Sequence, residues 1–416
     1  MFDVPIYWVT PFVLLLLSIA LIPLFLPHFW EKHFNKAGVA LVLAVPVALF
    51  LLASNPASLV DTLREYMAFI VLGGSLYIIA GGVDLEGDLR ATPLINTTFL
   101  AVGAVLASLI GTTGASMVLI RTFLKTNQER KNTAHLPLFF IFIVSNMGGL
   151  LTPIGDPPLF LGFLRGVPFF WTLLHLFPIW ALANGILLTT FFLFDSMKYR
   201  KESPQSLRLD KAHVEPLKLK GGFNFLLLLG VVGGVFLPSP LRETEMICMA
   251  LASLWLTPKK IRKQNGFNFH PLIEVALLFA AIFITMVPAL DLLKLHAPEL
   301  GITAPVHFYW FSGMLSSFLD NAPTYLTFFS LAQGLHLSGA SVVGITPAIL
   351  AAISAGSVMM GANTYIGNPP NFMVKAIADN SGLKTPSFIG YMLYSLLFLT
   401  PIYLLITFLF FTGHGL

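Results

Sequence analysis

Two aspartates stand in stretches of sequence that are otherwise apolar. Asp156 lies in the phrase IGDPP at residues 154–158, and Asp320 begins the phrase DNAPT at residues 320–324. An ionised carboxylate within hydrocarbon costs at least ~2.5 kcal/mol, so a membrane aspartate serves by default as an ion or proton site. Each aspartate could also cap the helix that follows it, Asp156 through an Asx turn and Asp320 as an N-cap residue. Because capping and ion binding are compatible, we predict that both aspartates bind ions.

Neutral side chains with oxygen atoms cluster symmetrically at the predicted helix breaks and hairpin tips of the two halves. Hard cations such as Na⁺ prefer oxygen ligands, by analogy with calcium and magnesium sites. Each of these side chains alone is equally well explained as a hydrogen bond between packed helices, and it is their clustering that favours an ion site. The set is Thr112, Thr113, Ser145, Asn146, Thr152, Asn321, Thr324, Asn363, Thr364 and Asn368. We expect a Na⁺ site that includes Asp156, Asp320, Asn146 and Asn363.

A short phrase with helix-breaking residues occurs twice in the chain. IGDPP at residues 154–158 recurs as IGNPP at residues 366–370, an offset of 366 − 154 = 212. Proline removes an N–H group and clashes with the preceding turn, so neither proline pair can lie inside an unbroken helix, and glycine permits the backbone conformation of a break. Broken membrane helices present their ends to ions at the middle of the bilayer. The predicted break residues are Gly155, Pro157, Pro158, Gly367, Pro369 and Pro370.

The same offset relates two polar tips that interrupt long apolar stretches. It carries the GTTG phrase at residues 111–114 to residues 323–326, beside Asp320 and Asn321. We predict re-entrant helical hairpins at residues 93–125 and 305–333, and broken helices at residues 135–163 and 343–378. Non-helical backbone at membrane depth is tolerated only where it is buried in protein or lines a cavity. The tips and breaks therefore predict where the site lies.

The composition excludes an ordinary water-soluble fold. Of the 416 residues, 56% are hydrophobic and only 11% are charged, whereas about a quarter of the residues are charged in globular proteins. Apolar runs approach the ~20 residues that cross a bilayer. The first run lacks a basic segment and a cleavage site, so we expect a transmembrane helix there and not a signal peptide. The sequence predicts an all-α polytopic membrane protein, without thiol chemistry at its single cysteine, Cys248.

The chain divides into two halves with one pattern. We predict a first repeat at residues 1–195, a cytoplasmic linker at 196–221 and a second repeat at 222–416. Each repeat has five spans, one of them broken, plus a re-entrant hairpin. The spans begin near residues 6, 37, 66, 135 and 170, and near residues 222, 243, 271, 343 and 386. Because five is odd, the two repeats have opposite orientations in the membrane.

The distribution of basic residues agrees with this topology. Only Arg64, Arg165, Arg242 and Lys294 fall in predicted outer segments, which leaves 24 − 4 = 20 Lys and Arg, Lys384 among them, on the predicted inner side. Cytoplasmic loops retain Lys and Arg. We therefore expect a multi-pass protein of the bacterial inner (plasma) membrane with both termini periplasmic. The net charge of +4 reflects this topology, and no nucleic-acid partner is expected.

The remaining ionisable residues have simpler explanations. Glu274 lies in the first turn of a span, where a carboxylate interacts favourably with the helix dipole. His135 and His175 lie near the ends of spans, as packing or interface residues do, and Arg121 is expected to extend toward the cytoplasmic surface. The chain has no phosphate-binding loop, no Cys/His metal spacing and no nucleophile elbow. We expect no enzyme activity and no cofactor besides Na⁺ as a transported or coupling ion.

Three phrases resemble those of the ion transporter superfamily, which includes NhaD-type sodium/proton antiporters, arsenite permeases, citrate transporters of the CitMHS type and divalent-anion/sodium symporters. They are LTPIGD at residues 151–156, LDNAPT at 319–324, and GANT at 361–364 followed by IGNP at 366–369. The resemblance covers both halves. It implies an elevator-type homodimer in the lipid bilayer, in which the hairpins, the broken helices and the last spans move against a scaffold of the remaining spans.

The resemblance leaves the substrate open between a small cation and a carboxylate. NhaD-type antiporters are similar in placing one aspartate after Thr-Pro-Ile-Gly and another in the second hairpin, as Asp156 and Asp320 are placed. Carboxylate symporters use paired Ser-Asn-Thr motifs, whereas this chain has SNM at residues 145–147 and ANT at 362–364. The resemblance therefore implies exchange of Na⁺ for H⁺ at a midplane site between the repeats. The alternatives are Na⁺- or H⁺-coupled citrate or dicarboxylate symport, and arsenite or other anion permeation.

Overall fold

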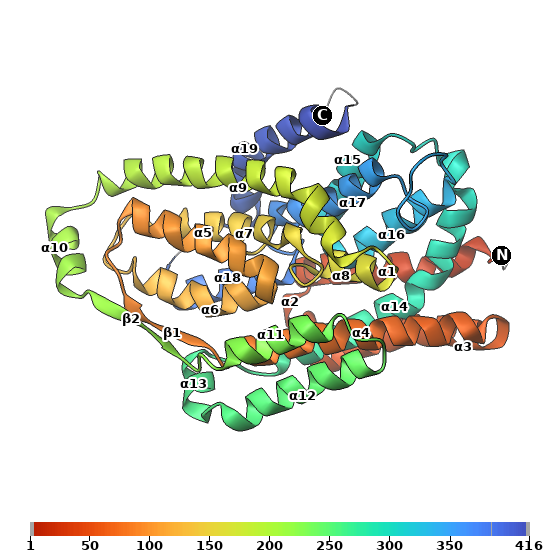
Figure 1. Ribbon diagram of the computed structural model, residues 1–416, viewed down its shortest axis with the longest axis horizontal. Coiled ribbons are helices and arrows are strands. Elements are labelled where there is room, and N and C mark those ends of the chain that lie inside the picture. The colour runs from red at the N-terminus through yellow and green to blue at the C-terminus, as the bar shows by residue number, and fades with distance from the viewer. Residues whose placement is uncertain (1–3, 384, 413–416) are drawn as a thin grey trace.

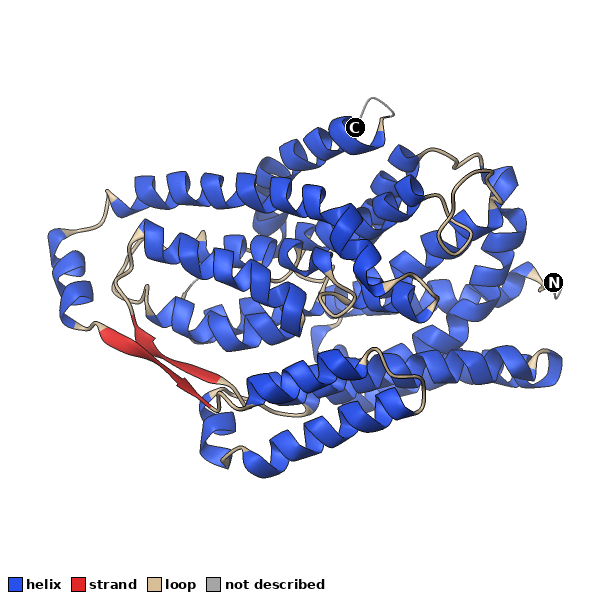
Figure 2. Cartoon of the chain, in the orientation of Figure 1, coloured by secondary structure: helices blue, strands red, loops and turns tan. Residues whose placement is uncertain are grey.

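The computed structural model describes residues 4–383 and 385–412 of the chain, and these residues are mostly helical (Figures 1 and 2). By length and composition, seven of the described helical segments could cross a membrane: Ile6–Pro23, His33–Ser54, Pro56–Ala80, Pro93–Ile110, Phe169–Tyr199, His270–Leu300 and Phe388–Phe411. The protein is thus an all-α polytopic membrane protein, as the composition predicts. Lys384, assigned above to the inner side, lies outside the described residues, as do the ends of the two predicted repeats at residues 1–3 and 413–416.

The N-terminal helices pack against a long helix from the second half of the chain. A 3₁₀ turn at Ile6–Val9 leads into α1 (Thr10–Phe25), α2 (Pro27–Trp30), α3 (His33–Ser54) and α4 (Pro56–Ala80). Pro56 suits the first turn of α4 because its missing N–H group would have no partner there. Both α3 and α4 contact α14 (His270–His296). Glu274 at the start of α14 forms an ion pair with Lys36 of α3, a partner that the sequence analysis did not foresee.

Two helix pairs occupy the ranges of the expected hairpins. α5 (Pro93–Ile110) and α6 (Thr112–Lys125) are joined only by Gly111, whose φ of +81° lies in the region that favours glycine. α15 (Pro305–Phe318) and α16 (Asn321–Gly334) are joined by Leu319 and Asp320. The second helices of the pairs begin 321 − 112 = 209 residues apart, three fewer than the offset of the repeated phrase.

Each broken helix consists of two helices with a non-helical segment between them. The first is formed by α7 (Leu136–Ile143), a 3₁₀ turn at Met147–Leu151 and α8 (Pro157–Leu164), and α9 (Phe169–Tyr199) follows it. The second is formed by α17 (Pro347–Met359), a 3₁₀ turn at Met360–Asn363 and α18 (Pro369–Asn380), and α19 (Phe388–Ile406) follows it. Helices α8 and α18 both begin at the first residue of a proline pair.

The segment between the halves contains a helix and a strand. After α10 (Pro204–Ala212), β2 (Glu215–Lys220) pairs antiparallel with β1 (Asp84–Asp88), with Asp84 opposite Lys220 (Figure 2). This ribbon was not predicted, because both strands are short and rich in charged residues, and β2 alternates only two leucines, Leu217 and Leu219, with its lysines. Its ends are held by ion pairs, Lys220 with Glu86 and Lys125 with Glu215.

The first helices of the second half are shorter than expected. α11 (Asn224–Gly234) and α12 (Leu241–Leu256) contain 11 and 16 residues, or about 16 and 24 Å at 1.5 Å per residue, against ~30 Å of hydrocarbon. α13 (Lys259–Gln264) and then α14 follow, with a 3₁₀ turn at Ala297–Leu300 before α15. The sequence analysis placed full spans near residues 222 and 243, and began α4 ten residues too late, at residue 66 instead of 56.

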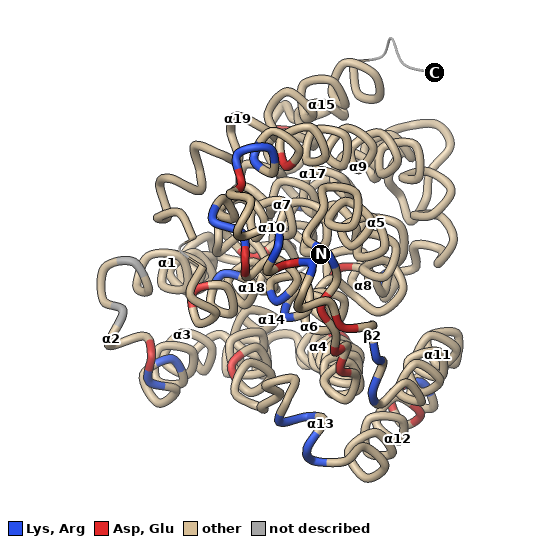
Figure 3. Tube along the Cα trace, turned by 90° about the vertical axis from the view of Figure 1, so that its left-hand side faces the viewer, with Lys and Arg blue, Asp and Glu red and all other residues tan. Residues whose placement is uncertain are grey.

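The helices form two groups that contact each other through α4 and α14. The first group contains α1, α3, α4, α11, α12 and α14, and the second contains α5 to α9 and α15 to α19 (Figure 1). Between the groups, α14 contacts α16, and α4 contacts α6 and α8. Figure 3 faces the end of the molecule with α10, α13 and β2, where Lys and Arg of α13 are visible. We call these the α4–α14 group and the α5–α19 group.

Candidate functional site

The two breaks are built from the same hydrogen bonds. In the first break the N–H group of Gly155 donates to the hydroxyl of Thr152 at 3.2 Å, and in the second the N–H group of Gly367 donates to the hydroxyl of Thr364 at 3.1 Å. Both threonines have extended backbones and also donate their hydroxyls to a carbonyl of the neighbouring hairpin. The hydroxyl therefore replaces hydrogen-bond partners that the broken helix has lost.

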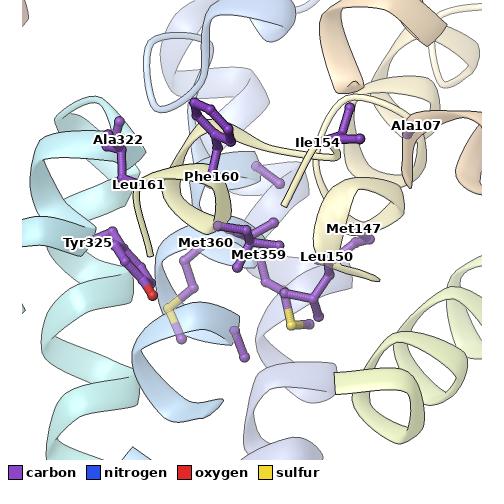
Figure 4. Packing of buried hydrophobic residues seen from close by; sticks show 14 of the residues in the cluster. Ala107, Met147, Leu150, Ile154, Phe160, Leu161, Ala322, Tyr325, Met359 and Met360 are labelled. Carbon is purple, nitrogen blue, oxygen red and sulfur yellow. The ribbon is translucent and has the colours of Figure 1, made fainter. Parts of the chain in front are cut away.

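Glycine is required inside each break because the backbone folds back on itself. A Cβ atom on Gly155 would lie 2.2 Å from the carbonyl oxygen of Gly149. A Cβ atom on Gly367 would lie 2.5 Å from that of Gly361. No real Cβ contact is this short, so the prediction that both glycines are break residues has a steric basis. Apolar side chains such as Met147, Leu150, Ile154 and Met360 surround the breaks (Figure 4).

Asp156 is the residue on which the two halves converge. It precedes α8, is 1% exposed, and its side chain does not cap the helix, so the Asx-turn alternative is wrong. Instead Oδ1 accepts hydrogen bonds from the hydroxyl of Thr112 at 2.9 Å and from Nδ2 of Asn368 at 3.2 Å. Oδ2 accepts a hydrogen bond from Nδ2 of Asn321. All of these donors are neutral, so the hydrogen bonds stabilise a carboxylate without cancelling its charge.

Two amide oxygens beside Asp156 have no hydrogen-bond donor among the described residues. They are Oδ1 of Asn321 and Oδ1 of Asn368, and both side chains are fully buried. A buried acceptor without a donor costs about 1–3 kcal/mol. Oxygen atoms of this kind are the ligands that a small hard cation such as Na⁺ prefers, and the amide nitrogens of the same two side chains contact Asp156.

Asp320 has a different environment from Asp156. It is the N-cap residue of α16, and its Oδ1 accepts the N–H group of Ala322 at 3.0 Å. The capping role considered in the sequence analysis is therefore present. Asp320 also lines the cavity described next, so capping leaves the carboxylate near the site. The hydroxyl of Thr324 donates to the main-chain oxygen of Asp320 at 3.0 Å and thus serves α16 itself.

A cavity of about 170 Å³ lies against both aspartates, where the two groups of helices meet. Its lining comes from the tip at Gly111 to Gly114, from the first break, and from apolar side chains of α4 and α14. Thr112 and Thr113 both line this cavity, and Thr112 also donates its hydroxyl to Asp156. Among the described lining residues there is no Lys, Arg or His, so the charge at the cavity comes only from carboxylates.

Several predicted site residues do not touch Asp156. Asn363 donates from Nδ2 to the hydroxyl of Ser317 at 2.8 Å and accepts the hydroxyl of Tyr403 at 3.1 Å, so the structure does not join it to the expected Na⁺ ligands. The hydroxyl of Ser145 lies 2.9 Å from that of Ser116. Asn146 contacts Asn368 and not Asp156.

Sequence reasoning missed one residue of this network. Asn371 is fully buried, and its side chain contacts both breaks. It lies three residues after Asn368 in the phrase NPPN, so its place in the first turn after the break was a signal that could have identified it. The position 212 residues earlier is Leu159, and the repeat comparison therefore did not select it.

A second polar cluster, also missed, lies in the α5–α19 group away from the cavity. Arg130 and Asp195 form an ion pair at 2.6 Å with side chains that are 1% and 0% exposed. Asp195 also accepts Nδ2 of Asn96 at 3.0 Å and contacts Nε2 of His135 at 2.8 Å. His135 is thus part of a buried charge network, and not only a packing residue.

Comparison with known protein families gives one match. The model of the family described as "Putative citrate transport" matches residues 1–411 and therefore covers both halves and both breaks. No curated protein matches the chain.

Proposed function

The chain belongs to the citrate-transport family whose model it matches and is a secondary transporter; we propose that it exchanges Na⁺ for H⁺ at a site centred on Asp156. The observation that carries this proposal is the buried carboxylate of Asp156, held by three neutral donors beside two amide oxygens without a donor. Such a carboxylate requires one positive charge, and either Na⁺ or a proton can supply it.

The exchange follows from competition at this site. Movement of a buried charge past apolar surface is costly, so the site reorients only when Asp156 is neutralised by one of the two ions. Asp320 lines the same cavity and interacts electrostatically with Asp156. Two nearby carboxylates do not ionise independently, so binding of Na⁺ at one changes proton binding at the other.

We further propose that the two halves are inverted repeats and that the α5–α19 group moves against the α4–α14 group. This is supported by the matching hydrogen bonds of the two breaks and by the position of the cavity between the groups. The lining residues Tyr77 and Leu272 belong to the ends of α4 and α14 nearest to α13, whose basic residues suit the cytoplasmic side. In this state the site would face the cytoplasm.

Citrate or dicarboxylate symport is the second candidate, and the family match favours it. However, the described residues that line the cavity include no basic side chain that could pair with the carboxylate of a substrate. The proline pairs at the starts of α8 and α18 also remove N–H groups that would otherwise bind an anion at a helix N-terminus. A carboxylate substrate would therefore have to bind together with cations.

Everted membrane vesicles with a respiration-driven pH gradient distinguish the two functions. Na⁺, Li⁺ and then citrate are added while a pH-sensitive dye is followed. We expect Na⁺ or Li⁺ to collapse the gradient, and Asp156→Asn and Asp320→Asn to abolish the response. The control Asp61→Asn alters an exposed aspartate whose partner is the exposed Arg64, and should behave as wild type. Absence of a cation response, with sodium-dependent uptake of labelled citrate, would instead establish the symporter.

A further inference from the structure

Three buried asparagines form a chain of contacts that ends at Asp156. Nδ2 of Asn371 donates to the carbonyls of Gly361 at 2.8 Å and Thr364 at 2.9 Å. Oδ1 of Asn371 accepts Nδ2 of Asn146 at 2.7 Å. Oδ1 of Asn146 accepts Nδ2 of Asn368 at 3.2 Å, and the same Nδ2 lies 3.2 Å from Oδ1 of Asp156. The asparagines in this chain of contacts are all fully buried.

We infer that Asn371 is a positioning residue of the ion site, which acts on Asp156 through Asn146 and Asn368. This inference rests on the proposed cation site. Asn371 lies on α18 of the second half, whereas Asn146 and Asp156 belong to the first break. Asn371 thus fixes the two breaks relative to each other as well as the amide that contacts Asp156.

Main-chain carbonyls fix the orientation of all three amides. A main-chain carbonyl can only accept, so Asn371 must present Nδ2 to Gly361 and Thr364 and Oδ1 to Asn146. Asn146 must then donate from Nδ2, which also donates to the carbonyl of Ile141 at 2.8 Å, and it turns Oδ1 toward Asn368. A reversed amide at any step would place two donors or two acceptors face to face.

Asn368 is the last amide in this chain of contacts, and its oxygen is a proposed ligand of the ion. Because Nδ2 of Asn368 is committed to Asn146, to Asp156 and to the carbonyl of Ser145 at 3.0 Å, its Oδ1 is left without a donor. This oxygen is one of the two proposed neutral ligands of the cation. Loss of Asn371 removes the acceptor that holds Nδ2 of Asn146. The carbonyls of Ile141 and Ser145 still orient the two remaining amides, but the first break is no longer held in place against the second, so Oδ1 of Asn368 would shift relative to Asp156.

The test substitutes Asn371 by leucine, which has a similar shape and occupies the corresponding position, Leu159, of the first phrase. In everted vesicles, Asn371→Leu should raise the KM for Na⁺ by about tenfold, the change expected for one lost interaction of ~1.4 kcal/mol. Vmax should stay near the wild-type value. The double variant Asn146→Ala/Asn371→Leu should show nearly the same KM as Asn146→Ala, since the two residues act in one chain of contacts.

A buried asparagine away from the cavity provides a control that separates an effect on the position of the site from an effect on the stability of the whole protein. Asn96 is also fully buried, but it donates to Asp195 and Asn127, away from the cavity. Asn96→Leu should lower the thermal unfolding temperature in detergent and leave the KM for Na⁺ unchanged. If Asn371→Leu is too unstable to purify, Asn371→Ala removes the same amide without adding volume and should show the same rise in KM.

A wild-type KM in folded Asn371→Leu or Asn371→Ala, with only the amount of folded protein or Vmax reduced, would overturn the positioning role. An additive rise in KM in the double variant would also overturn it. Failure of the proposed function has a different signature, because wild-type vesicles would then show no Na⁺ or Li⁺ response at all.

Discussion

Asp156 and Asn368, which occupy the same position in the two copies of the repeated phrase, are hydrogen-bonded to each other at 3.2 Å. They also share a backbone conformation, with φ and ψ of −147° and 144° at Asp156 and −149° and 134° at Asn368. The candidate site is therefore located where the two breaks meet. One copy contributes a carboxylate and the other an amide, so the pair carries a single negative charge and avoids repulsion between two acids.

Thr112 and Thr113 provide a matched pair for testing the ligands of Asp156. Thr112→Val removes a hydroxyl that donates to Asp156 at 2.9 Å, whereas Thr113 lines the cavity. A hydrogen bond to a charged group contributes about 1.5–3 kcal/mol, so the carboxylate of the variant is harder to ionise and Na⁺ competes less well with protons. We expect the KM for Na⁺ at fixed pH to rise about tenfold or more in Thr112→Val and to change little in Thr113→Val. Equal effects in the two variants would contradict this geometry.

The steric requirement of the first break can be tested with two glycines. Gly155→Ala places a Cβ atom 2.2 Å from the carbonyl oxygen of Gly149, whereas Gly185→Ala in α9 has no other atom within 4 Å. Overpacking of this kind costs about 1–3 kcal/mol. Alanine in the helix should instead stabilise by ~0.5–1 kcal/mol. We expect Gly155→Ala to lower the thermal unfolding temperature in detergent and to abolish the Na⁺-dependent change of the pH-sensitive dye. Gly185→Ala should retain the wild-type unfolding temperature and dye response. An active and stable Gly155→Ala variant would show that the break can relax.

The ion pair between Arg130 and Asp195 should be important for stability and not for ion binding. Both side chains are buried, so Arg130→Met leaves an uncompensated charge, at a cost of about 3–5 kcal/mol. The double variant Arg130→Met/Asp195→Asn removes the charge at position 195, where the side-chain oxygen can still accept from Asn96, and leaves only that of Glu202, which lies 3.9 Å from Arg130. It should unfold at a higher temperature than the single variant. Both proteins, once folded, should keep the wild-type KM for Na⁺, and a shifted KM would link this cluster to the site.

Asp88, at the end of β1 in the ribbon, should make the free energy of unfolding depend on pH. The pKa of Asp88 is raised from 3.8 to about 6, mainly by burial and also by Glu129, Asp210 and Glu215, while Lys125 acts to lower it. The folded protein therefore binds this proton more tightly than the unfolded chain does. The free energy of unfolding should then fall as the pH rises from about 4 to about 6, and stay low above that range.

The measurement is the thermal unfolding temperature at pH 5 and pH 7. Wild type should gain stability at pH 5 relative to Asp88→Asn, whose side chain does not titrate. Asp61→Asn, at an exposed position, should keep the wild-type difference. The same difference between the two pH values in Asp88→Asn and wild type would show that another group is responsible.

The elements that proline and glycine delimit were predictable from sequence. The proline pairs at 157–158 and 369–370 begin α8 and α18, and Pro93 and Pro305 begin the first helices of the two hairpins. In each case the residue type fixes the local backbone whatever surrounds it. Asp156 was likewise predictable, because a carboxylate in an apolar segment requires partners.

Features that depend on contacts between distant segments were not predictable. Asn371 looks like any polar residue in a first turn, and its role arises only because Asn146, 225 residues away, meets it. The pairing of Arg130 with Asp195 depends in the same way on α9 returning past the loop before α7. The lengths of α11 and α12 are set by packing against each other and against α4, and hydropathy alone extended them too far.

The β1–β2 ribbon limits how the two groups of helices can separate. β1 runs from α4 toward α5, and β2 returns from α10 toward α11, so Asp84 and Lys220 are paired at one end and Asp88 and Glu215 at the other (Figure 1). Two of the three chain crossings between the groups thus lie side by side, with a length of about 17 Å for five extended residues. The third crossing is the connection from α14 to α15 at residues 297–304. Because both strands cross the same gap and are paired with each other, the ribbon cannot lengthen by sliding of one strand past the other. The ribbon therefore ties the two groups at one end of the molecule and the connection at residues 297–304 ties them elsewhere, so the proposed movement between the groups must preserve both links.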